Sequence, residues 1–346
     1  MSSPPGRCLV FTSPLEPDLV ERVRSASDGL EVVYPTELLA SPRYPSAHPL
    51  PSVEEDGATA RWNELLDGAE ILFDFGPVAL ASKLSARPRL RWIQATSAGV
   101  GRFAERAGLL DSEITITTAS GPHARPLAEF ALLAMLMFGK NTLHLTRQQR
   151  EHRWERHADE EVRGKVVCVV GLGKIGLEVA RLATALDARV IGTVRTLDGR
   201  TAAELGVERL ETTERLDELL PQADVVVLAT PHTPETHHLV DARRLALMKP
   251  TAILVNVARG DVVDEQALVA ALGDGRLKGA ALDVFEQEPL PPESPLWDLP
   301  NVFVSPHSAS TVAAENGRIA DLFCENIRRY LAEEPLLNVL DKELLY

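Results

Sequence analysis

The stretch Val166-Val-Cys-Val-Val-Gly-Leu-Gly-Lys-Ile-Gly176 decides the fold prediction, because an apolar run leads directly into a GxGxxG turn. The next segment, Leu177–Leu186, has helical character, and a second apolar run follows at Val190–Val194. In such a unit the first glycine permits a tight turn, the second lets the backbone approach a pyrophosphate, and the third lets helix pack on strand. We therefore expect a dinucleotide at the helix N-terminus; a glycine-rich turn that holds no ligand is the alternative.

Short apolar runs alternate with helical segments along nearly the whole chain. Several runs are apolar at successive positions, as expected of parallel strands that are covered on both faces. The alternation predicts an α/β fold with two doubly wound parallel-sheet domains. The expected strands are Cys8–Phe11, Glu31–Tyr34, Ile71–Phe75, Leu90–Ala95, Ile114–Thr118, Val166–Val170, Val190–Val194, Val225–Ala229, Ile253–Val257, Ala280–Phe285 and Val302–Ser305.

Length and charge limit the class of protein. The 346 residues suffice for two domains of about 100–200 residues each. With 45% apolar and 25% charged residues, the chain is of ordinary globular composition and is not largely disordered. Lys and Arg number 36 against 50 Asp and Glu, a formal net charge of −14. Such a field repels phosphate backbones and anionic lipid, so we expect no nucleic-acid or membrane partner.

The cysteines and the N-terminus indicate the compartment. Cys8, Cys168 and Cys324 are far apart with no C-x-x-C pair, so we expect neither a disulfide framework nor a zinc site, and no metal. The first seven residues lack the apolar core of a signal peptide. The longest apolar run, Phe130–Phe138, is far short of the ~20 residues that a membrane span needs. The expectation is a soluble, cytoplasmic protein.

The segment Tyr34–Trp62 interrupts the alternation of strands and helices. Its prolines favour a long surface loop, and a lid over the active site is the alternative. The prolines are Pro35, Pro42, Pro45, Pro49 and Pro51.

The segment Leu127–Gly139 is apolar nearly all round, which predicts a buried helix. Pro126 in its first turn and Gly139 near its end fit the usual helix boundaries. The helix is expected either to pack only within its own domain or to form a subunit contact as well.

The end of the second strand of the glycine-turn unit indicates which dinucleotide is bound. An acidic residue about 20 positions beyond the turn normally binds the ribose hydroxyls. Here the end of the strand reads Gly192-Thr-Val-Arg-Thr196 and contains no acid. Asp187 precedes the strand, and Asp198 lies beyond it. Without a carboxylate nothing repels a 2′-phosphate, and Arg195 offers a bidentate donor for one. The sequence thus favours NADP(H), with NAD(H) possible; Arg195 as a solvated loop charge is the other interpretation.

Three polar residues follow apolar strands in the second half, where open α/β sheets place their ligands. They are Arg259 after Ile253–Ala258, Glu288 after Ala280–Phe285, and His307 after Val302–Pro306. Arg can bind the carboxylate and carbonyl oxygens of a 2-oxo acid, and His can donate the proton that accompanies hydride. A carboxylate beside the ring orients it and stabilises its protonated form. Each residue alone would be more typical of a structural role.

Further stretches lie in the order found in D-isomer-specific 2-hydroxyacid dehydrogenases, and the chain resembles that family. They are Val170-Gly-Leu-Gly-Lys-Ile-Gly176, Ala229-Thr-Pro-His-Thr-Pro-Glu-Thr236, Val255-Asn-Val-Ala-Arg-Gly260, Ala281-Leu-Asp-Val-Phe285 with Glu288-Pro289, and Ser305-Pro-His307. Ser97-Ala-Gly-Val100 and Arg125-Pro-Leu-Ala-Glu-Phe130 are similar to the family's substrate loop and first nucleotide-domain helix. The first 90 residues match only in general pattern.

The resemblance implies roles for individual residues. Arg259, Glu288 and His307 would be the catalytic set, with Glu288 chosen because it directly precedes Pro289 and Glu286 as the competitor. The substrate would be bound by the backbone of Ala98, Gly99 and Val100 and by Arg259 and His307. The implied cofactor residues are Gly171, Gly173, Lys174, Ile175, Gly176, Arg195, Thr196, Pro231, Thr236, Val257, Ala258, Asp283 and Ser310.

The resemblance also implies a topology and an assembly. A Rossmann dinucleotide-binding domain, 121–308, would be inserted into a flavodoxin-like substrate-binding domain formed by 1–120 and 309–346. A C-terminal helix would return to the first domain through Ile319, Leu322, Phe323, Ile327 and Leu331. Homodimers would form through the region of Leu127–Phe138.

The function that follows is hydride transfer between NADP(H), or NAD(H), and a 2-oxo acid/D-2-hydroxy acid pair. A dinucleotide-sensing, co-repressor-like scaffold is a second hypothesis, although a pure sensor needs no proton donor. A phosphite dehydrogenase-like activity is a third. The side chain of the 2-oxo acid is not identified by the sequence.

Overall fold

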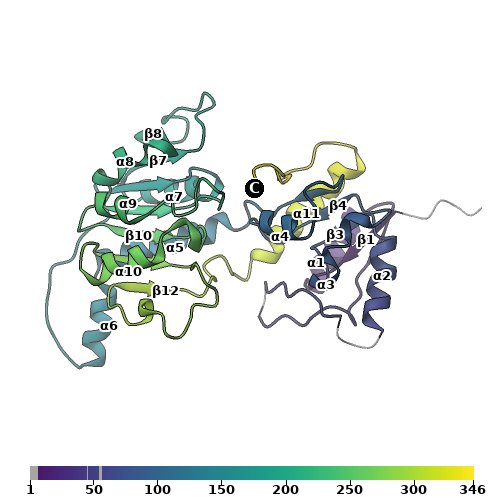
Figure 1. Cartoon of the computed structure of the whole chain (residues 1–346), viewed down its shortest axis with the longest axis horizontal. Helices are drawn as coiled ribbons and strands as arrows, with labels where there is room; N and C mark the ends of the chain where they lie inside the picture. Colours follow the sequence, from purple (N-terminus) through teal and green to yellow (C-terminus); the bar gives the residue numbers. More distant parts are fainter. Residues whose placement is uncertain (1–6, 45, 54–56) are drawn as a thin grey trace, which may run out of the picture. The chain divides into compact units, whose positions relative to one another are not determined.

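The computed structural model describes residues 7–44, 46–53 and 57–346 and divides the chain into two compact units (Figure 1). Unit 1 comprises the residues up to His123 together with Thr311–Tyr346, and unit 2 comprises Ala124–Ser310. Pro45 of the proline-rich segment and the first six residues lie outside the described residues. Each unit is built on a parallel sheet, which confirms the predicted fold class.

Unit 1 has a five-stranded sheet in the order β2-β1-β3-β4-β5. This is the flavodoxin-like doubly wound order, in which helices cover both faces. The strands are β1 (Arg7–Phe11), β2 (Leu30–Val33), β3 (Ile71–Phe73), β4 (Trp92–Gln94) and β5 (Thr115–Thr117). The helices are α1 (Pro17–Ala26), α2 (Ala58–Gly68), α3 (Val78–Ala81), α4 (Gly101–Arg106) and α11 (Glu315–Leu331).

The last helix, α11, packs on the same face of this sheet as α1. Ile319, Phe323 and Ile327 are fully buried there, and Arg22 of α1 forms an ion pair of 2.6 Å with Asp321. The predicted return of the C-terminal segment is therefore correct. Leu322 and Leu331, predicted on the same face, are only half-buried because they flank the contact.

Unit 2 has a seven-stranded parallel sheet in the order β12-β11-β10-β9-β6-β7-β8. The order reverses between β6 and β9, so the crevice at their carboxyl ends is the place where such sheets bind dinucleotides. The strands are β6 (Val166–Val170), β7 (Arg189–Val194), β8 (Arg209–Thr212), β9 (Val225–Leu228), β10 (Ile253–Asn256), β11 (Gly279–Leu282) and β12 (Val302–Val304). The helices are α5 (Ala124–Gly139), α6 (Thr142–Arg150), α7 (Lys174–Thr184), α8 (Leu216–Leu219), α9 (Ala242–Leu247) and α10 (Glu265–Gly273).

Two separate apolar cores lie on the two faces of the unit 2 sheet. One gathers α5 and α7 over β6, β7 and β9, and the other gathers α8, α9 and α10 on the opposite face. The central strands β6, β9 and β10 are buried on both sides, which explains their continuous apolar sequence. Both units also contain short 3-10 helices. Those of unit 2 are Thr213–Arg215, Leu220–Gln222, Gly260–Val262 and Pro295–Trp297, and that of unit 1 is Leu84–Ala86.

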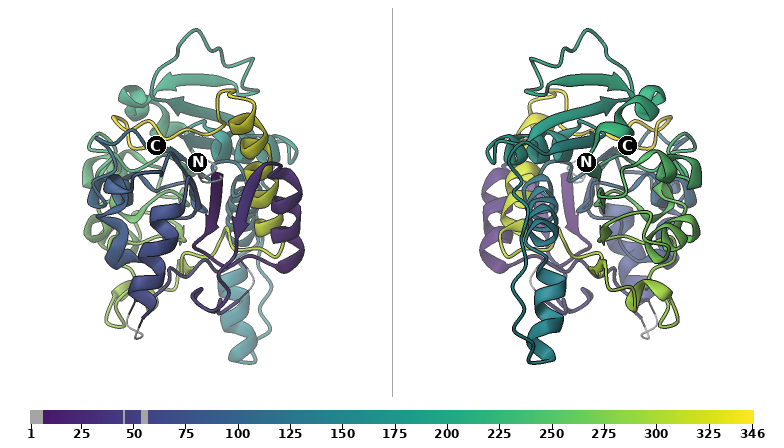
Figure 2. Two further views of the ribbon diagram at one scale, coloured as in Figure 1. Left: turned by 90° about the vertical axis from the view of Figure 1, so that its right-hand side faces the viewer. Right: turned by 90° about the vertical axis from the view of Figure 1, so that its left-hand side faces the viewer.

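Helix α5 is buried along most of its length, as predicted, but one stripe is left open. Leu133 is 48% and Leu136 41% exposed, whereas Ala131, Ala134 and Met135 are buried. Helix α6 stands away from the body of unit 2 in Figures 1 and 2, and its Leu145 is also exposed.

Three details correct the expectations from sequence. Strand β8, Arg209-Leu-Glu-Thr212, was not predicted because it is polar, and an edge strand with half-buried positions has no continuous apolar run. The expected surface loop ended at Trp62, but α2 begins at Ala58 and buries Trp62 completely. The predicted strands also end earlier than expected, by two residues at β3 and three at β11, because the residues after the strands already belong to the loops that carry polar groups.

Within the part of the chain that the structure describes, no helix has the length and hydrophobicity required to cross a membrane. The three cysteines are free thiols, and Cys168 and Cys324 are buried.

Candidate active site

The glycine turn of unit 2 lies between β6 and α7, at the switch point of the sheet. Gly171 has φ +97°, and a Cβ there would lie 2.9 Å from the carbonyl oxygen of Ala229. A Cβ on Gly176 would lie 2.1 Å from the carbonyl oxygen of Gly171, so the helix packs on the turn only with glycine. At Gly173 nothing lies within 4 Å of the Cβ position. The turn is tight where the backbone needs it and open where a pyrophosphate would approach.

The start of α7 provides the phosphate end of this site. The 11-residue helix begins at Lys174 and Ile175, with Gly173 as its N-cap and no side-chain cap. The first backbone N–H groups of such a helix need acceptors, which a pyrophosphate supplies. Burial lowers the pKa of Lys174.

The hydroxyl group of Thr230, beside the glycine turn, is a second feature that a bound ligand would explain. Among the described residues, Thr230 Oγ1 is buried and has no hydrogen-bond partner, although it lies beside Gly171 at the end of β9. A buried hydroxyl in this condition costs about 1–3 kcal/mol unless a ligand or water satisfies it. The residues present therefore fit a dinucleotide.

The loop after β9 has a rigid turn that contains Pro231 and Thr236. Thr236 Oγ1 donates to the carbonyl of Pro231 at 2.8 Å and accepts from the backbone N–H of Thr233 at 2.8 Å. The hydrogen bond from Thr233 and, at longer range, the charge of Arg195 hold the pKa of Glu235 below its usual range. Arg195, the residue after β7, therefore lies near enough to this loop for its charge to act on Glu235.

The residues after β7 contain no carboxylate placed like the usual ribose ligand. Val194 ends the strand, and Thr196 Oγ1 donates to Asp198 at 2.5 Å. Asp187 lies at the other end of β7, where it pairs with Arg163 at 3.1 Å. Arg200 donates to the carbonyl of Thr196 at 2.6 Å, so a second guanidinium stands in this turn.

The structure brings His307 and Glu288 together. His307 Nδ1 lies 2.7 Å from Glu288 Oε2, and Glu288 Oε1 accepts from the backbone N–H of Phe285 at 3.0 Å. Burial acts to raise the pKa of Glu288, but these hydrogen bonds and the charges of His307 and Arg259 outweigh it, so that pKa lies below its usual range. Glu288 is therefore ionised at neutral pH and presents a carboxylate to the ring.

The loop that carries His307 is held by Asp283. Asp283 Oδ1 accepts from Ser305 Oγ at 2.6 Å and from the backbone N–H groups of Ser308 and Ala309, both at 2.9 Å. The three donors lie on either side of His307 in the chain, and His307 itself has φ +52°. Burial raises the pKa of Asp283 although the three donors oppose it. This positioning role was not predicted, because the three donors lie more than 20 residues from Asp283 in the chain.

The turn that follows β10 holds the backbone of Arg259 in place. Asn256 accepts from the backbone N–H of Ala258 and donates to the carbonyl of Arg259, both at 3.0 Å. A Cβ on Gly260 would lie 1.9 Å from the carbonyl carbon of Phe285, so this backbone lies against the loop that leads to Glu288. Burial lowers the pKa of Arg259, while the charges of Glu288 and Asp283 oppose the shift.

The competing carboxylate has other partners. Glu286 Oε1 lies 2.8 Å from His238 Nε2 and accepts from the backbone N–H of Glu265 at 3.1 Å. Glu286 is thus held away from the His307 pair. Val257 and Ala258 are buried beside Arg259, and Ser310 is half-buried at the end of unit 2.

The residues Ala98, Gly99 and Val100 belong to unit 1, between β4 and α4. In the same unit Asp74 is buried with φ +74° and accepts from Thr96 Oγ1 at 2.8 Å. A buried carboxylate in a left-handed turn is a feature that only the three-dimensional structure reveals.

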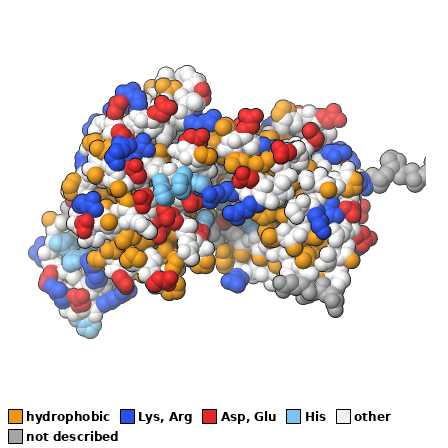
Figure 3. Space-filling view, in the orientation of Figure 1, with side chains coloured by type: hydrophobic (Ala, Val, Ile, Leu, Met, Phe, Trp, Pro, Cys, Tyr) orange, Lys and Arg blue, Asp and Glu red, His pale blue; other side chains and the backbone are white. Residues whose placement is uncertain are grey.

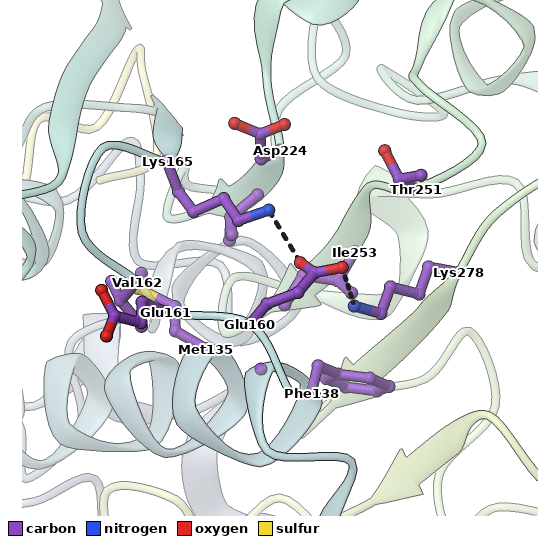
Figure 4. A pocket seen from close by; sticks show the side chains of 12 residues that line it. Met135, Phe138, Glu160, Glu161, Val162, Lys165, Asp224, Thr251, Ile253 and Lys278 are labelled. Atoms are coloured by element: carbon purple, nitrogen blue, oxygen red, sulfur yellow. Dashed lines mark hydrogen bonds and ion pairs between the residues drawn. The ribbon is translucent and has the colours of Figure 1, made fainter. Parts of the chain in front are cut away.

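A small pocket in unit 2 lies at the opposite, amino-terminal edge of the sheet. Its volume is about 30 Å³, and its lining includes Glu160, Lys165 and Lys278 (Figure 4). Glu160 pairs with Lys165 at 2.7 Å and with Lys278 at 3.3 Å. The pocket is too small for a dinucleotide, and both of its lysines pair with Glu160.

A Rossmann-type sheet, a glycine turn at its switch point and an Arg, Glu and His at its carboxyl edge define a dinucleotide-dependent oxidoreductase. Residues 132–309 match the family model described as D-isomer specific 2-hydroxyacid dehydrogenase, NAD binding domain. The chain belongs to the D-isomer-specific 2-hydroxyacid dehydrogenase family, whose members are NAD(P)-dependent oxidoreductases acting on CH–OH groups.

Individual relatives show how far the similarity extends. The chain is 35% identical over 275 residues to a glyoxylate reductase of Thermofilum pendens, covering 77% of this chain and 79% of the relative. A D-isomer specific 2-hydroxyacid dehydrogenase of Xanthobacter autotrophicus, solved with NADPH and MES, is 34% identical with a TM-score of 0.80, covering 99% and 100% of the two chains. An NADPH-dependent glyoxylate/hydroxypyruvate reductase of Sinorhizobium meliloti, solved with NADP and sulfate, is 25% identical with a TM-score of 0.77, covering 98% and 100%.

Proposed function

We propose that this protein is an NADPH-dependent reductase of small 2-oxo acids of the glyoxylate and hydroxypyruvate class. The observation that carries the proposal is the His307–Glu288 pair, 2.7 Å long, at the sheet edge that also holds Arg259. The relatives named glyoxylate reductase and glyoxylate/hydroxypyruvate reductase support the substrate class. They lend no support to a co-repressor-like scaffold or to phosphite oxidation.

Each residue of the pair has a distinct task in this proposal. The bound nicotinamide supplies the hydride. His307 donates the proton to the carbonyl oxygen, and Glu288 stabilises the protonated ring and fixes its Nδ1 side, which leaves Nε2 for the substrate. Arg259 binds the carboxylate and carbonyl oxygens with its planar guanidinium. Asp283 positions the His307 loop.

The cofactor assignments rest on unit 2. Gly171, Gly173, Gly176, Lys174 and Ile175 are proposed to surround the pyrophosphate, an assignment that the open Gly173 supports. Pro231, Thr236, Val257, Ala258, Asp283 and Ser310 are proposed to line the rest of the cofactor site. Arg195 and Thr196 are proposed for the 2′-phosphate, supported by the absence of an acid at Val194 and by NADPH and NADP in the two structures above.

Unit 1 is proposed as the substrate-binding domain and unit 2 as the dinucleotide-binding domain. The backbone of Ala98, Gly99 and Val100 is proposed to hold the substrate carboxylate, on the family resemblance of Ser97-Ala-Gly-Val100. The proline-rich segment as a lid remains a hypothesis. The free thiols of all three cysteines support a reducing compartment such as the cytoplasm.

The assembly is proposed to be a homodimer formed through α5 and α6. Leu133, Leu136 and Leu145 are exposed on these helices, and Trp154 in the following segment is 94% exposed. Apolar side chains that gather on a projecting element are typical of protein–protein contacts.

The decisive experiment is an activity panel. Glyoxylate, hydroxypyruvate, pyruvate and phenylpyruvate are each reduced with NADPH and with NADH, and kcat/KM is compared. We expect glyoxylate and hydroxypyruvate with NADPH to give the highest values. Reduction of none of the four, or a preference for phenylpyruvate, would overturn the substrate class, and a preference for NADH would overturn the cofactor assignment.

A further inference from the structure

The loop between β9 and α9 contains three histidines, and two of them face a carboxylate from the next loop of the sheet. One ring nitrogen of His232, one of His237 and a carboxylate oxygen of Asp261 all lie within 4.8 Å of one another. His232 Nε2 lies 3.4 Å from His237 Nδ1. Figure 3 shows a compact group of histidine side chains on the surface of unit 2.

The separation of 3.4 Å between His232 Nε2 and His237 Nδ1 allows a long hydrogen bond, and it also fits two ligands of one ion. Zn–N bonds of about 2.0–2.1 Å at tetrahedral angles place two ligating nitrogens about 3.3–3.4 Å apart. A hydrogen bond is usually shorter, with a donor–acceptor distance of about 2.7–3.2 Å. The rings are inclined at 73° with their centroids 5.6 Å apart, so both can direct a nitrogen to one point without stacking.

The backbone holds the three candidate ligands in place. The Thr233–Thr236 turn fixes the separation of His232 and His237 through the bonds of Thr236 Oγ1. The backbone N–H of His238 donates to the carbonyl of Asp261 at 2.7 Å, which joins the two loops directly beside the candidate ligands. The arrangement therefore depends on the fold and not on a metal to assemble it.

A neighbouring ring and carboxylate orient His237. Its ring stacks on His238, with centroids 4.1 Å apart and an angle of 18°. His238 is in turn fixed by Glu286 at 2.8 Å. This stacking restrains the orientation of the His237 ring.

The donor set selects the kind of ion. Two imidazoles and one carboxylate suit Zn²⁺, Co²⁺ or Ni²⁺, whereas Mg²⁺ and Ca²⁺ prefer oxygen ligands throughout. Three protein ligands leave a fourth position for water. His237 is exposed, so an ion can enter from solvent.

We propose that His232, His237 and Asp261 form a binding site for a first-row divalent transition metal. This departs from the expectation of no metal, which rested on the spacing of the cysteines alone. The proposal concerns binding and does not depend on the proposed reductase activity.

Calorimetric titration of ZnCl2 into the tag-free, chelator-treated full chain tests it. We expect one Zn²⁺ per chain with a Kd in the micromolar range or tighter, and an increase in Tm with Zn²⁺. His232→Gln, His237→Gln and Asp261→Asn should each weaken binding at least ~10-fold. His144→Gln is the matched control, since His144 packs against another histidine, His157, at 5.6 Å elsewhere in unit 2.

Absence of a one-to-one binding phase in the wild type would overturn the proposal, and so would affinity that His232→Gln and His237→Gln leave intact. Loss of binding in His144→Gln alone would assign the ion to the other histidine pair and would also overturn it. Tm without Zn²⁺ checks that each variant is folded. His237 is exposed, so His237→Gln decides the outcome if either other variant is destabilised.

Discussion

The His307–Glu288 pair is the smallest unit on which the chemistry depends. If His307 donates the proton, His307→Ala should lower kcat by ~10²–10⁴ while NADPH affinity stays nearly unchanged. Steady-state kinetics with glyoxylate and a fluorescence titration of NADPH measure the two effects separately. Normal turnover of His307→Ala would remove the proton-donor role.

Glu288→Gln tests the partner of that ring by pH. The change removes the negative charge that faces His307 Nδ1 at 2.7 Å, so it should lower kcat/KM for reduction at each pH where Glu288 is ionised in the wild type. The pKa of Glu288 itself lies below its usual range, so the contribution of the pair to folding is present above about pH 4.3 and is lost as the pH falls through that lowered value. A profile of kcat/KM against pH measures the first effect. Glu286→Gln, which removes the partner of His238, is the control and should leave the profile unchanged.

Arg259 tests the geometry of substrate binding. Only a planar guanidinium can address two oxygens in one plane, whereas Lys offers a single point charge. Arg259→Lys should therefore raise KM for the 2-oxo acid and lower kcat, although the formal charge is the same. Arg276→Lys, an exposed residue that pairs with Asp274, provides the matched control. Wild-type kinetics in Arg259→Lys would contradict the anchoring role.

At the scale of elements, the end of β7 should decide the cofactor. A charge-assisted contact from Arg195 to the 2′-phosphate contributes roughly 1.5–3 kcal/mol, or about 10–150-fold in discrimination. Arg195→Ala combined with Val194→Asp should shift the preference toward NADH. The ratio of kcat/KM for NADPH to that for NADH measures this preference. An unchanged ratio would show that the residues at the end of β7 do not bind the 2′-phosphate.

The packing of α5 on α7 should depend on pH. Hydrogen bonds from Arg181 and Arg125 hold the pKa of Glu178 at about 2. Because this is below the ordinary value, the contribution to stability is complete above about pH 4.3 and disappears as the pH falls toward the folded value. Glu178→Gln should lower the free energy of unfolding by about 0.5–1 kcal/mol at pH 7, and by progressively less toward pH 2. Urea unfolding across this range measures it, with exposed Glu105→Gln as the control; a loss that is independent of pH would refute the ionic origin.

For the whole molecule, the testable property is the oligomeric state. Sedimentation should give about 75 kDa, twice the 37.7 kDa of one chain, as expected for a two-fold homodimer. Leu136→Glu on α5 should yield the monomer because it places a charge in the proposed apolar contact. Val78→Glu, at an apolar residue of unit 1 that is 61% exposed against 41% for Leu136, should not. A wild-type monomer at micromolar concentration would contradict the dimer.

The sequence by itself determined the described strands of both sheets except β8, and the position of the glycine turn, because these depend on local properties. Continuous apolar runs are sufficient for strands buried on both faces, and a turn with two crowded positions requires glycine at 171 and 176. Arg259, Glu288 and His307 were also predicted to lie at one edge of the sheet, since carboxyl ends of parallel strands meet there, and their catalytic roles stay a prediction. The edge strand β8 was not predicted, because its residues are half-buried and do not form an apolar run.

Only the tertiary structure decided which groups meet. Glu288 contacts His307 while Glu286 contacts His238, although both acids lie in the same short loop. Asp283 reaches Ser305 and the N–H groups of Ser308 and Ala309, more than 20 residues away. His232 and His237 lie beside Asp261 for the same reason. Such contacts depend on how successive loops of the sheet pack against one another, and this long-range geometry leaves no periodic signal in the chain.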